Sequence, residues 1–136
     1  MIVVLFSYTM REDADVEEEE ATADRMWSIV TAMPGFISYK AYTADDGERI
    51  AVVRFESREA LDAWKGQLEH QAAQERAREE WYEDYWIQAS ETFRQYRFTR
   101  SNGYGQIPRD VFLKGARELP EAVAVSREPV GDGEPD

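Results

Sequence analysis

His70 is the single histidine of the chain, and its chemistry makes it the first candidate for catalysis. An unperturbed imidazole titrates near neutral pH, so His70 could act as a general base that removes a proton from a phenol or an enol. Trp64 stands shortly before it in the sequence, and its indole could position an aromatic substrate by stacking. A structural alternative stays open for the histidine, because at a helix break it could cap backbone carbonyls instead.

Three arginines are further candidates for a functional role, and the absence of cysteine excludes several classes of site. Arg54, Arg94 and Arg97 fall in predicted strands, where they could pair with glutamates across a sheet or stabilise a bound enolate or phenolate. The chain has no cysteine, which excludes disulfides, thiolate nucleophiles, zinc ribbons and iron–sulfur clusters. With only one histidine in addition, we expect no dedicated metal site.

Length and charge limit the class of protein. The chain has 136 residues, which is enough for one domain with a real core. Sixteen basic against 28 acidic residues give a net charge of −12, which repels nucleic acid and anionic membrane surfaces. No apolar run is long enough to cross a bilayer, and residues 1–8 lack the basic flank and cleavage region of a signal peptide. We therefore expect a cytoplasmic protein that binds neither nucleic acid nor membranes.

The first half of the chain reads as a strand, a helix and a hairpin. Residues 2–6 are apolar at every position, which predicts a strand buried on both faces. Apolar residues at helical spacing predict a helix over residues 14–33, which Pro34-Gly35 ends. Two strands follow over residues 36–42 and 50–55, and Asp46-Gly47 between them supplies the positive φ that a tight hairpin requires.

The next part reads as a broken helix and a last strand. Ser57 can accept the first free N–H groups of a helix, whereas Gly66 weakens it. We therefore expect a break between residues 65 and 70, followed by a second helical piece that reaches Trp81. The last strand is predicted over residues 85–98, where the apolar residues change parity, and a bulge near Arg94 would explain the change.

The order β-α-β-β-α-β is that of an α+β, ferredoxin-like split βαβ sandwich. Such a sheet leaves one face uncovered, and strands that are apolar on both sides predict that a second copy covers it in a homodimer. We place this domain at residues 1–99. Residues 100–136 are rich in glycine and proline, which predicts a partly disordered C-terminal extension with one short helix between residues 109 and 125 and a disordered end from residue 126.

One series of residues carries a family resemblance. A strand ends in Phe55-Glu56-Ser57, and Glu59-Ala60-Leu61, Ala63-Trp64 and Glu69-His70 follow it. This series resembles the antibiotic biosynthesis monooxygenase family, whose members are small α+β domains that usually pair into dimeric α+β barrels. The resemblance implies a pocket between the sheet and the broken helix, lined here by Ser7, Tyr39, Phe55, Trp64, Leu68, His70, Trp81 and Tyr85. The alternative is that these aromatic residues form a plain hydrophobic core.

The family contains two chemistries, and the resemblance separates them by residue type. Haem-degrading members place an asparagine where Ser7 stands, and their histidine ligand falls near Ala73 or Gln74. Neither haem residue is present in this chain. Cofactor-free members oxidise electron-rich polycyclic phenols or quinols in an apolar pocket with a group that removes a proton. The resemblance therefore implies a cofactor-independent monooxygenase acting on a small aromatic substrate.

Three other functions remain open at this point. The cavity could hold an apolar ligand without catalysis, the domain could be a dimerising structural module whose tail docks on another protein, or the chain could belong to the haem branch after all. The sequence contains neither a phosphate-binding loop nor a dinucleotide fingerprint. No nucleotide cofactor is therefore expected.

Overall fold

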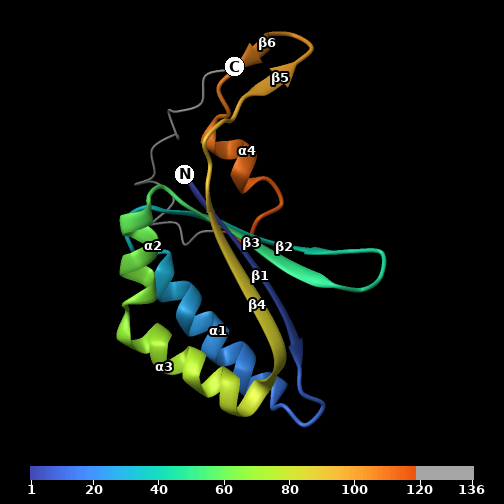
Figure 1. Cartoon of the computed structure of the whole chain (residues 1–136), viewed down its shortest axis with the longest axis vertical. Helices are drawn as coiled ribbons and strands as arrows, with labels where there is room; N and C mark the ends of the chain where they lie inside the picture. The colour runs from blue at the N-terminus through green and yellow to red at the C-terminus, as the bar shows by residue number, and fades with distance from the viewer. Residues whose placement is uncertain (119–136) are drawn as a thin grey trace.

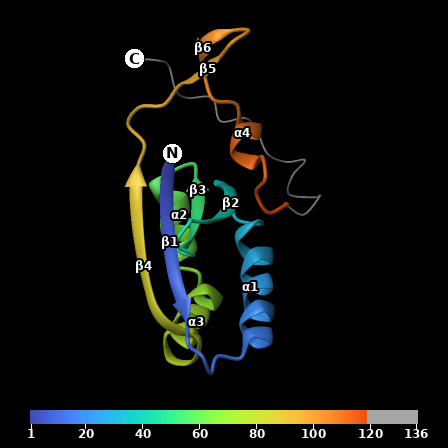
Figure 2. The same ribbon diagram turned by 90° about the vertical axis from the view of Figure 1, so that its right-hand side faces the viewer.

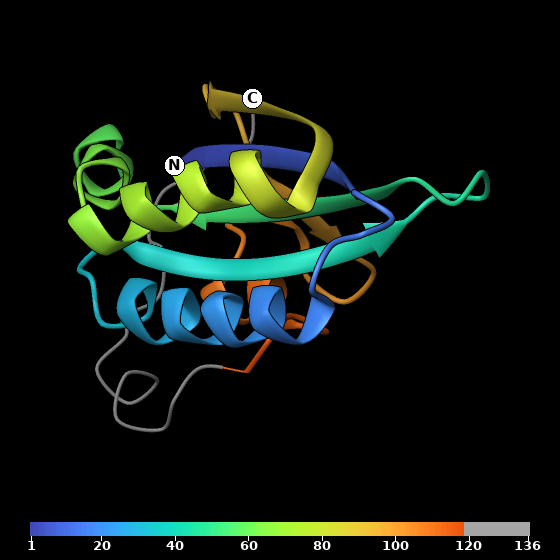
Figure 3. The same ribbon diagram turned by 90° about the horizontal axis from the view of Figure 1, so that it is seen from below.

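The computed structural model describes residues 1–118 and confirms the ferredoxin-like α+β fold (Figure 1). The elements in chain order are β1 (Ile2–Met10), α1 (Val16–Val30), β2 (Phe36–Thr43), β3 (Arg49–Phe55), α2 (Arg58–Lys65), α3 (Leu68–Arg76), the π-helical turn η1 (Ala77–Trp81), β4 (Tyr82–Glu91), β5 (Arg97–Thr99), β6 (Gly103–Gly105) and α4 (Arg109–Leu113). Strands β1 to β4 form one antiparallel sheet in the order β2-β3-β1-β4. Figure 3 shows α1 and α3 running along this sheet.

The predicted hairpin is confirmed at its turn. Gly47 has a φ of +91°, a conformation that only glycine adopts without strain. The Asp46 carboxylate accepts a hydrogen bond from the Glu48 N–H at 2.9 Å, and the Ala44 N–H donates to the Glu48 carbonyl at 2.8 Å. The turn therefore fixes the register of β2 against β3, in which Tyr39 lies opposite Val53.

The helix break is also confirmed where glycine predicted it. The Ser57 hydroxyl accepts from the Ala60 N–H at 3.1 Å and begins α2. Helix α2 ends at Lys65, Gly66 follows, and the Gln67 side chain accepts from the His70 N–H at 2.7 Å to begin α3. The break turns the chain so that Trp64 at the end of α2 and His70 in the first turns of α3 meet.

The two faces of the sheet differ in what covers them. Residues that lie opposite each other in an antiparallel pair point to the same face. Val4, Val53 and Ala89 are partners of this kind, and they face the helices together with Phe36 and Phe55, which are each 1% exposed. The alternate residues, among them Leu5, point away from the helices.

The C-terminal part of the predicted last strand is wrong. Strand β4 ends at Glu91, which pairs with Ile2 at the start of β1, so the ladder has no further partner strand to follow. Residues 97–99 pair instead with residues 103–105 in a separate hairpin, β5-β6, which projects from the end of the molecule (Figure 1). The bulge predicted near Arg94 is absent from the described ladders, whose register shifts lie at Thr9–Met10 and around Ile37.

Helix α4 confirms a short helix after residue 108, and it covers part of the face that points away from the other helices. It lies next to β2 and far from β4 (Figure 2). The Phe112 ring lies 4.7 Å from the Arg54 guanidinium. The predicted disordered end from residue 126 lies outside the described residues.

Candidate active site

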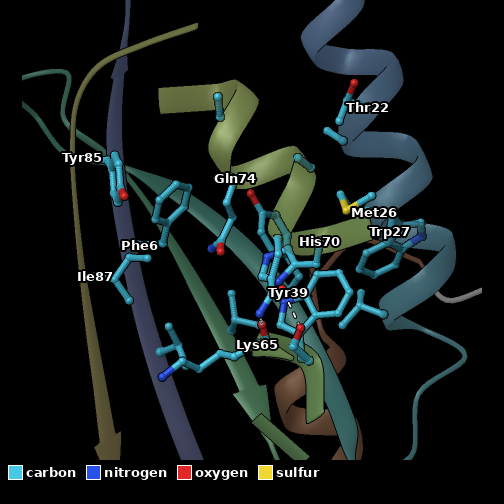
Figure 4. Close-up of a pocket in the computed structure, with 18 of the residues that line it drawn as sticks. Phe6, Thr22, Met26, Trp27, Tyr39, Lys65, His70, Gln74, Tyr85 and Ile87 are labelled. Carbon is cyan, nitrogen blue, oxygen red and sulfur yellow. Dashed lines mark hydrogen bonds between the residues drawn. The ribbon is translucent and has the colours of Figure 1, made fainter. Parts of the chain in front are cut away.

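A cavity of about 600 Å³ lies between the sheet and the helices. Phe6, Tyr85 and Ile87 from strands β1 and β4 line one wall, and Trp27 on α1 lines the wall across from them (Figure 4). His70 reaches in from α3. The volume and the mostly apolar lining suit a planar aromatic molecule of two or three rings.

The His70 imidazole lies flat on the Trp64 indole, with ring centroids 3.8 Å apart and an interplanar angle of 19°. His70 Nδ1 lies 3.1 Å from the Trp64 carbonyl oxygen. A carbonyl only accepts hydrogen bonds, so this contact places the proton on Nδ1 and leaves the lone pair on Nε2. Nε2 has no hydrogen-bond partner among the described residues. The histidine thus caps a carbonyl at the helix break and also presents a proton acceptor in the cavity wall.

Burial keeps this acceptor uncharged. Desolvation lowers the pKa of His70, and the hydrogen bond to the Trp64 carbonyl offsets only part of that effect. A histidine with a lowered pKa remains neutral at physiological pH and can take up a proton.

Three tyrosines and Thr22 supply the hydroxyl groups of the cavity. Tyr39 on β2 lines it together with Tyr82 and Tyr85 on β4. Burial raises the pKa of Tyr39 and that of Tyr82, so both phenols stay protonated and can donate hydrogen bonds. Tyr82 and Tyr85 stand edge to face at 5.8 Å.

Three residues with formal charges line the cavity: Glu19 on α1, Lys65 at the end of α2, and Arg117 beyond α4. Burial, with a smaller contribution from Glu20, raises the pKa of Glu19. Two cationic side chains against one carboxyl group reverse the acidic balance of the whole chain, whose net charge is −12.

The cavity contains most of the residues expected to line the pocket. Those that do are Tyr39, Phe55, Trp64, His70, Trp81 and Tyr85. Two expectations of position are wrong. Ser7 pairs with Ile50 and Trp86, so the alternation of β1 turns it to the opposite face of the sheet. Leu68 lies in the first turn of α3 and is 79% exposed, because the break points it to solvent.

The three candidate arginines lie outside the cavity. Arg54 points to the opposite face, where it contacts Phe112 and where burial lowers its pKa. Arg97 lies on the projecting hairpin, and Arg94 lies beside the 91% exposed Phe93 just before it.

Sequence reasoning missed several lining residues. Gln74 follows from the helical spacing of α3, and Tyr82 from a strand that begins three residues earlier than predicted. No sequence pattern indicated that Arg117 lines the cavity, because it reaches the cavity through contacts with residues far away in sequence, such as Asp24.

The positions that resemble haem-binding positions do not suit haem. Ala73 and Gln74 line the cavity. Alanine has no ligand atom, however, and the amide of glutamine is a poor iron ligand. In residues 1–118, no group of three or more histidine, aspartate or glutamate side chains could hold a metal ion.

Known proteins share this architecture. Solved structures with the same fold include Rv0793 from Mycobacterium tuberculosis, with a TM-score of 0.57 and 24% identity over 69% of this chain and 96% of that one. Another is SnoaB, a cofactor-independent oxygenase from Streptomyces nogalater, with a TM-score of 0.54 and 11% identity over 69% of this chain and 94% of that one.

In the part of the chain that the structure describes, no helix has the length and apolar character needed to span a membrane.

Comparison of sequences identifies the protein family, which similarity of fold alone does not. The uncharacterized protein YqjZ of Bacillus subtilis (strain 168) is 36% identical over 95 residues, which is 70% of this chain and 82% of that protein. The family model for antibiotic biosynthesis monooxygenases matches residues 1–76, which include Trp64 and His70. The chain therefore belongs to the antibiotic biosynthesis monooxygenase family.

Proposed function

We propose that the protein is a cofactor-independent monooxygenase that oxidises a phenolic or quinol-like polycyclic molecule, with His70 as general base and Trp64 as the residue that positions the ring. The observation that carries this proposal is the neutral imidazole held flat on Trp64 in the cavity wall, with Nε2 as a proton acceptor. Such a group can convert a phenol or an anthrone-type carbon acid into its electron-rich anion.

The reaction needs little more from the protein than this proton transfer and a dry cavity. The anion gives electrons to dioxygen. One oxygen atom replaces the two hydrogens of an anthrone methylene as a carbonyl, and the other leaves as water. The phenols of Tyr39 and Tyr82, kept protonated by burial, can donate hydrogen bonds to the substrate oxygens where negative charge gathers. Membership of SnoaB in the set of similar folds supports this chemistry by analogy alone.

Oxygen uptake with an anthrone-type phenol such as dithranol tests the proposal, after subtraction of the uncatalysed rate. His70→Ala should lower kcat by about 10²–10⁴-fold, the usual contribution of a general base. His70→Asn is the matched variant, because its amide can still donate to the Trp64 carbonyl but cannot act as a base. Both should lose turnover equally, and Trp64→Phe should mainly raise KM.

The pH profile gives an independent reading. Because burial lowers the pKa of His70, kcat/KM of the wild type should fall only below the ordinary range of a histidine, and the His70 variants should lose this limb. Full activity in His70→Asn would remove the histidine from the mechanism. Oxygen uptake with none of several anthrones and quinols would favour the alternative, a protein that binds a small aromatic molecule without oxidising it.

We further propose that the active form is a homodimer. Val3, Leu5, Val52 and Trp86 share the face that points away from the cavity, and α4 covers only the β2 side of that face. Apolar side chains on a half-open sheet favour a symmetric partner. Sedimentation velocity at micromolar concentration should give a dimer, and a stable, folded monomer would contradict this proposal.

A further inference from the structure

We propose that Arg117 forms a subsite for a carboxylate on the aromatic substrate, and that residues 109–117 are the segment that carries it to the cavity. This inference rests on the proposed function, because it assumes that the cavity holds an aromatic molecule. It adds a substrate class, a hydroxyaromatic carboxylic acid.

The segment runs around the edge of the sheet. It starts on the face that points away from α1, α2 and α3, where Phe112 contacts Arg54, and the Lys40 ammonium group donates to the Lys114 carbonyl at 3.1 Å. It then crosses the outer side of β2, where the Arg117 N–H donates to the Tyr39 carbonyl at 3.0 Å. The Arg117 side chain thereby reaches the helix side of the sheet and lines the cavity.

A buried arginine anchors the start of this segment. Arg109 is 5% exposed. Its guanidinium donates to Glu56 at 2.9 Å and to the Phe36 carbonyl at 3.0 Å. Charge-assisted hydrogen bonds of this kind fix a group in place. The start of the segment is therefore fixed to the sheet, and Arg117 is the residue of the segment that lines the cavity.

The Arg117 guanidinium is held with donors to spare. It lies 4.6 Å from the centre of the Trp27 ring, and its Nη2 donates to the Asp24 carboxylate at 2.9 Å. A guanidinium has five N–H donors in a planar fork that matches a carboxylate. The side chains of Trp27 and Tyr39 line the cavity beside it, so the fork stands next to surfaces on which an aromatic ring can pack.

The charges of the cavity support an anionic ligand. With a net charge of −12, the chain as a whole repels anions, so an acidic substrate requires local cations. Lys65 and Arg117 are the cationic residues among those that line the cavity, against Glu19 alone. Arg117 also lies beyond the part of the chain that the family model matches.

Calorimetric titration with two matched probes tests the inference: 6-hydroxy-2-naphthoate and its neutral amide, 6-hydroxy-2-naphthamide. The wild type should bind the carboxylate more tightly than the amide. Arg117→Gln should weaken carboxylate binding by roughly three- to tenfold, as expected for a half-exposed charged hydrogen bond, and should leave amide binding unchanged. Arg117→Lys should restore part of the difference.

Two further variants make the test sharp. Asp24→Asn removes the competing carboxylate and should tighten binding of the naphthoate. Arg25→Gln removes an exposed arginine of α1 that pairs with Glu69 and does not line the cavity, and it should change neither affinity. Equal binding of both probes by the wild type, or equal losses in Arg117→Gln and Arg25→Gln, would overturn this inference and leave the oxygenase proposal intact. Failure of both probes to bind would overturn both.

Discussion

Replacing Gly35 by alanine should destabilise the protein strongly, because two costs coincide at this residue. Gly35 has a φ of +86°, where an alanine is strained by about 1–2 kcal/mol. A Cβ built there would also lie 2.5 Å from Ala60 Cβ, well inside the 3.4–4 Å of ordinary contact. Forcing α2 away from the turn adds about 1–3 kcal/mol. We expect Gly35→Ala to lower the free energy of unfolding by roughly 2–5 kcal/mol in total.

Gly47 provides the matched control. Its φ of +91° is similar, but nothing lies within 4 Å of the Cβ it would gain. Gly47→Ala should therefore show the backbone cost alone, about 1–2 kcal/mol. Urea unfolding followed by circular dichroism measures the free energy of unfolding of both variants, provided that their m-values agree with that of the wild type.

Ala60→Gly separates the two costs at Gly35. Without the Ala60 methyl group, the nearest remaining atom named at this contact is the Ala60 Cα at 3.8 Å. Gly35→Ala should then cost about 1–3 kcal/mol less in the Ala60→Gly background than in the wild type. If Gly35→Ala and Gly47→Ala lower the free energy of unfolding equally, and Ala60→Gly does not change the effect of Gly35→Ala, the reasoning that a Cβ at residue 35 collides with Ala60 on α2 is refuted.

Four other outcomes are expected. Arg109→Met should cost about 2–3 kcal/mol in urea unfolding, because Glu56 and a carbonyl lose a buried charged donor; a neutral result would show that the anchor is dispensable. Since burial lowers the pKa of His70, the unfolded state takes up its proton first as the pH falls. Wild-type stability should therefore fall below about pH 6.5 relative to His70→Asn, and the difference in stability between the two should be independent of pH above that range. Deleting residues 126–136 should leave the melting temperature unchanged, whereas dissociation of the proposed dimer on this deletion would reveal a docked arm. Adding haemin should give no sharp Soret band that depends on His70, and a band lost in His70→Ala would move the protein to the haem branch.

Local signals in the sequence predicted the scaffold well. The turn at Gly47, the cap at Ser57 and the break at Gly66 each depend on residues within a few positions of one another. Such preferences act before tertiary packing, so the sequence alone predicted the break between Trp64 and His70. The stacking of the two rings was not predicted and was found only in the structure. Helix α1 ends at Val30, three residues before the end that Pro34-Gly35 predicted, and the turn at Gly35 follows it.

The errors concern features that depend on distant partners. Ser7 was assigned to the cavity, but both faces of β1 carry apolar residues, so the sequence could not indicate which face the helices cover. Strand β4 ends because β1 supplies no further partner, a limit set about ninety positions away. Arg117 is placed by contacts with Asp24 and Tyr39, and no local pattern encodes contacts over such a separation.

The unequal edges of the sheet bear on how copies of this chain can associate. Strands β2 and β4 form the two edges, and the Arg117 N–H already occupies a carbonyl on the outer side of β2. Growth of a continuous sheet from copy to copy requires that the β4 edge of one molecule meet the β2 edge of the next. The contact of Arg117 with β2 competes with that head-to-tail route. A two-fold contact closes on itself, so we expect that discrete pairs form in preference to filaments.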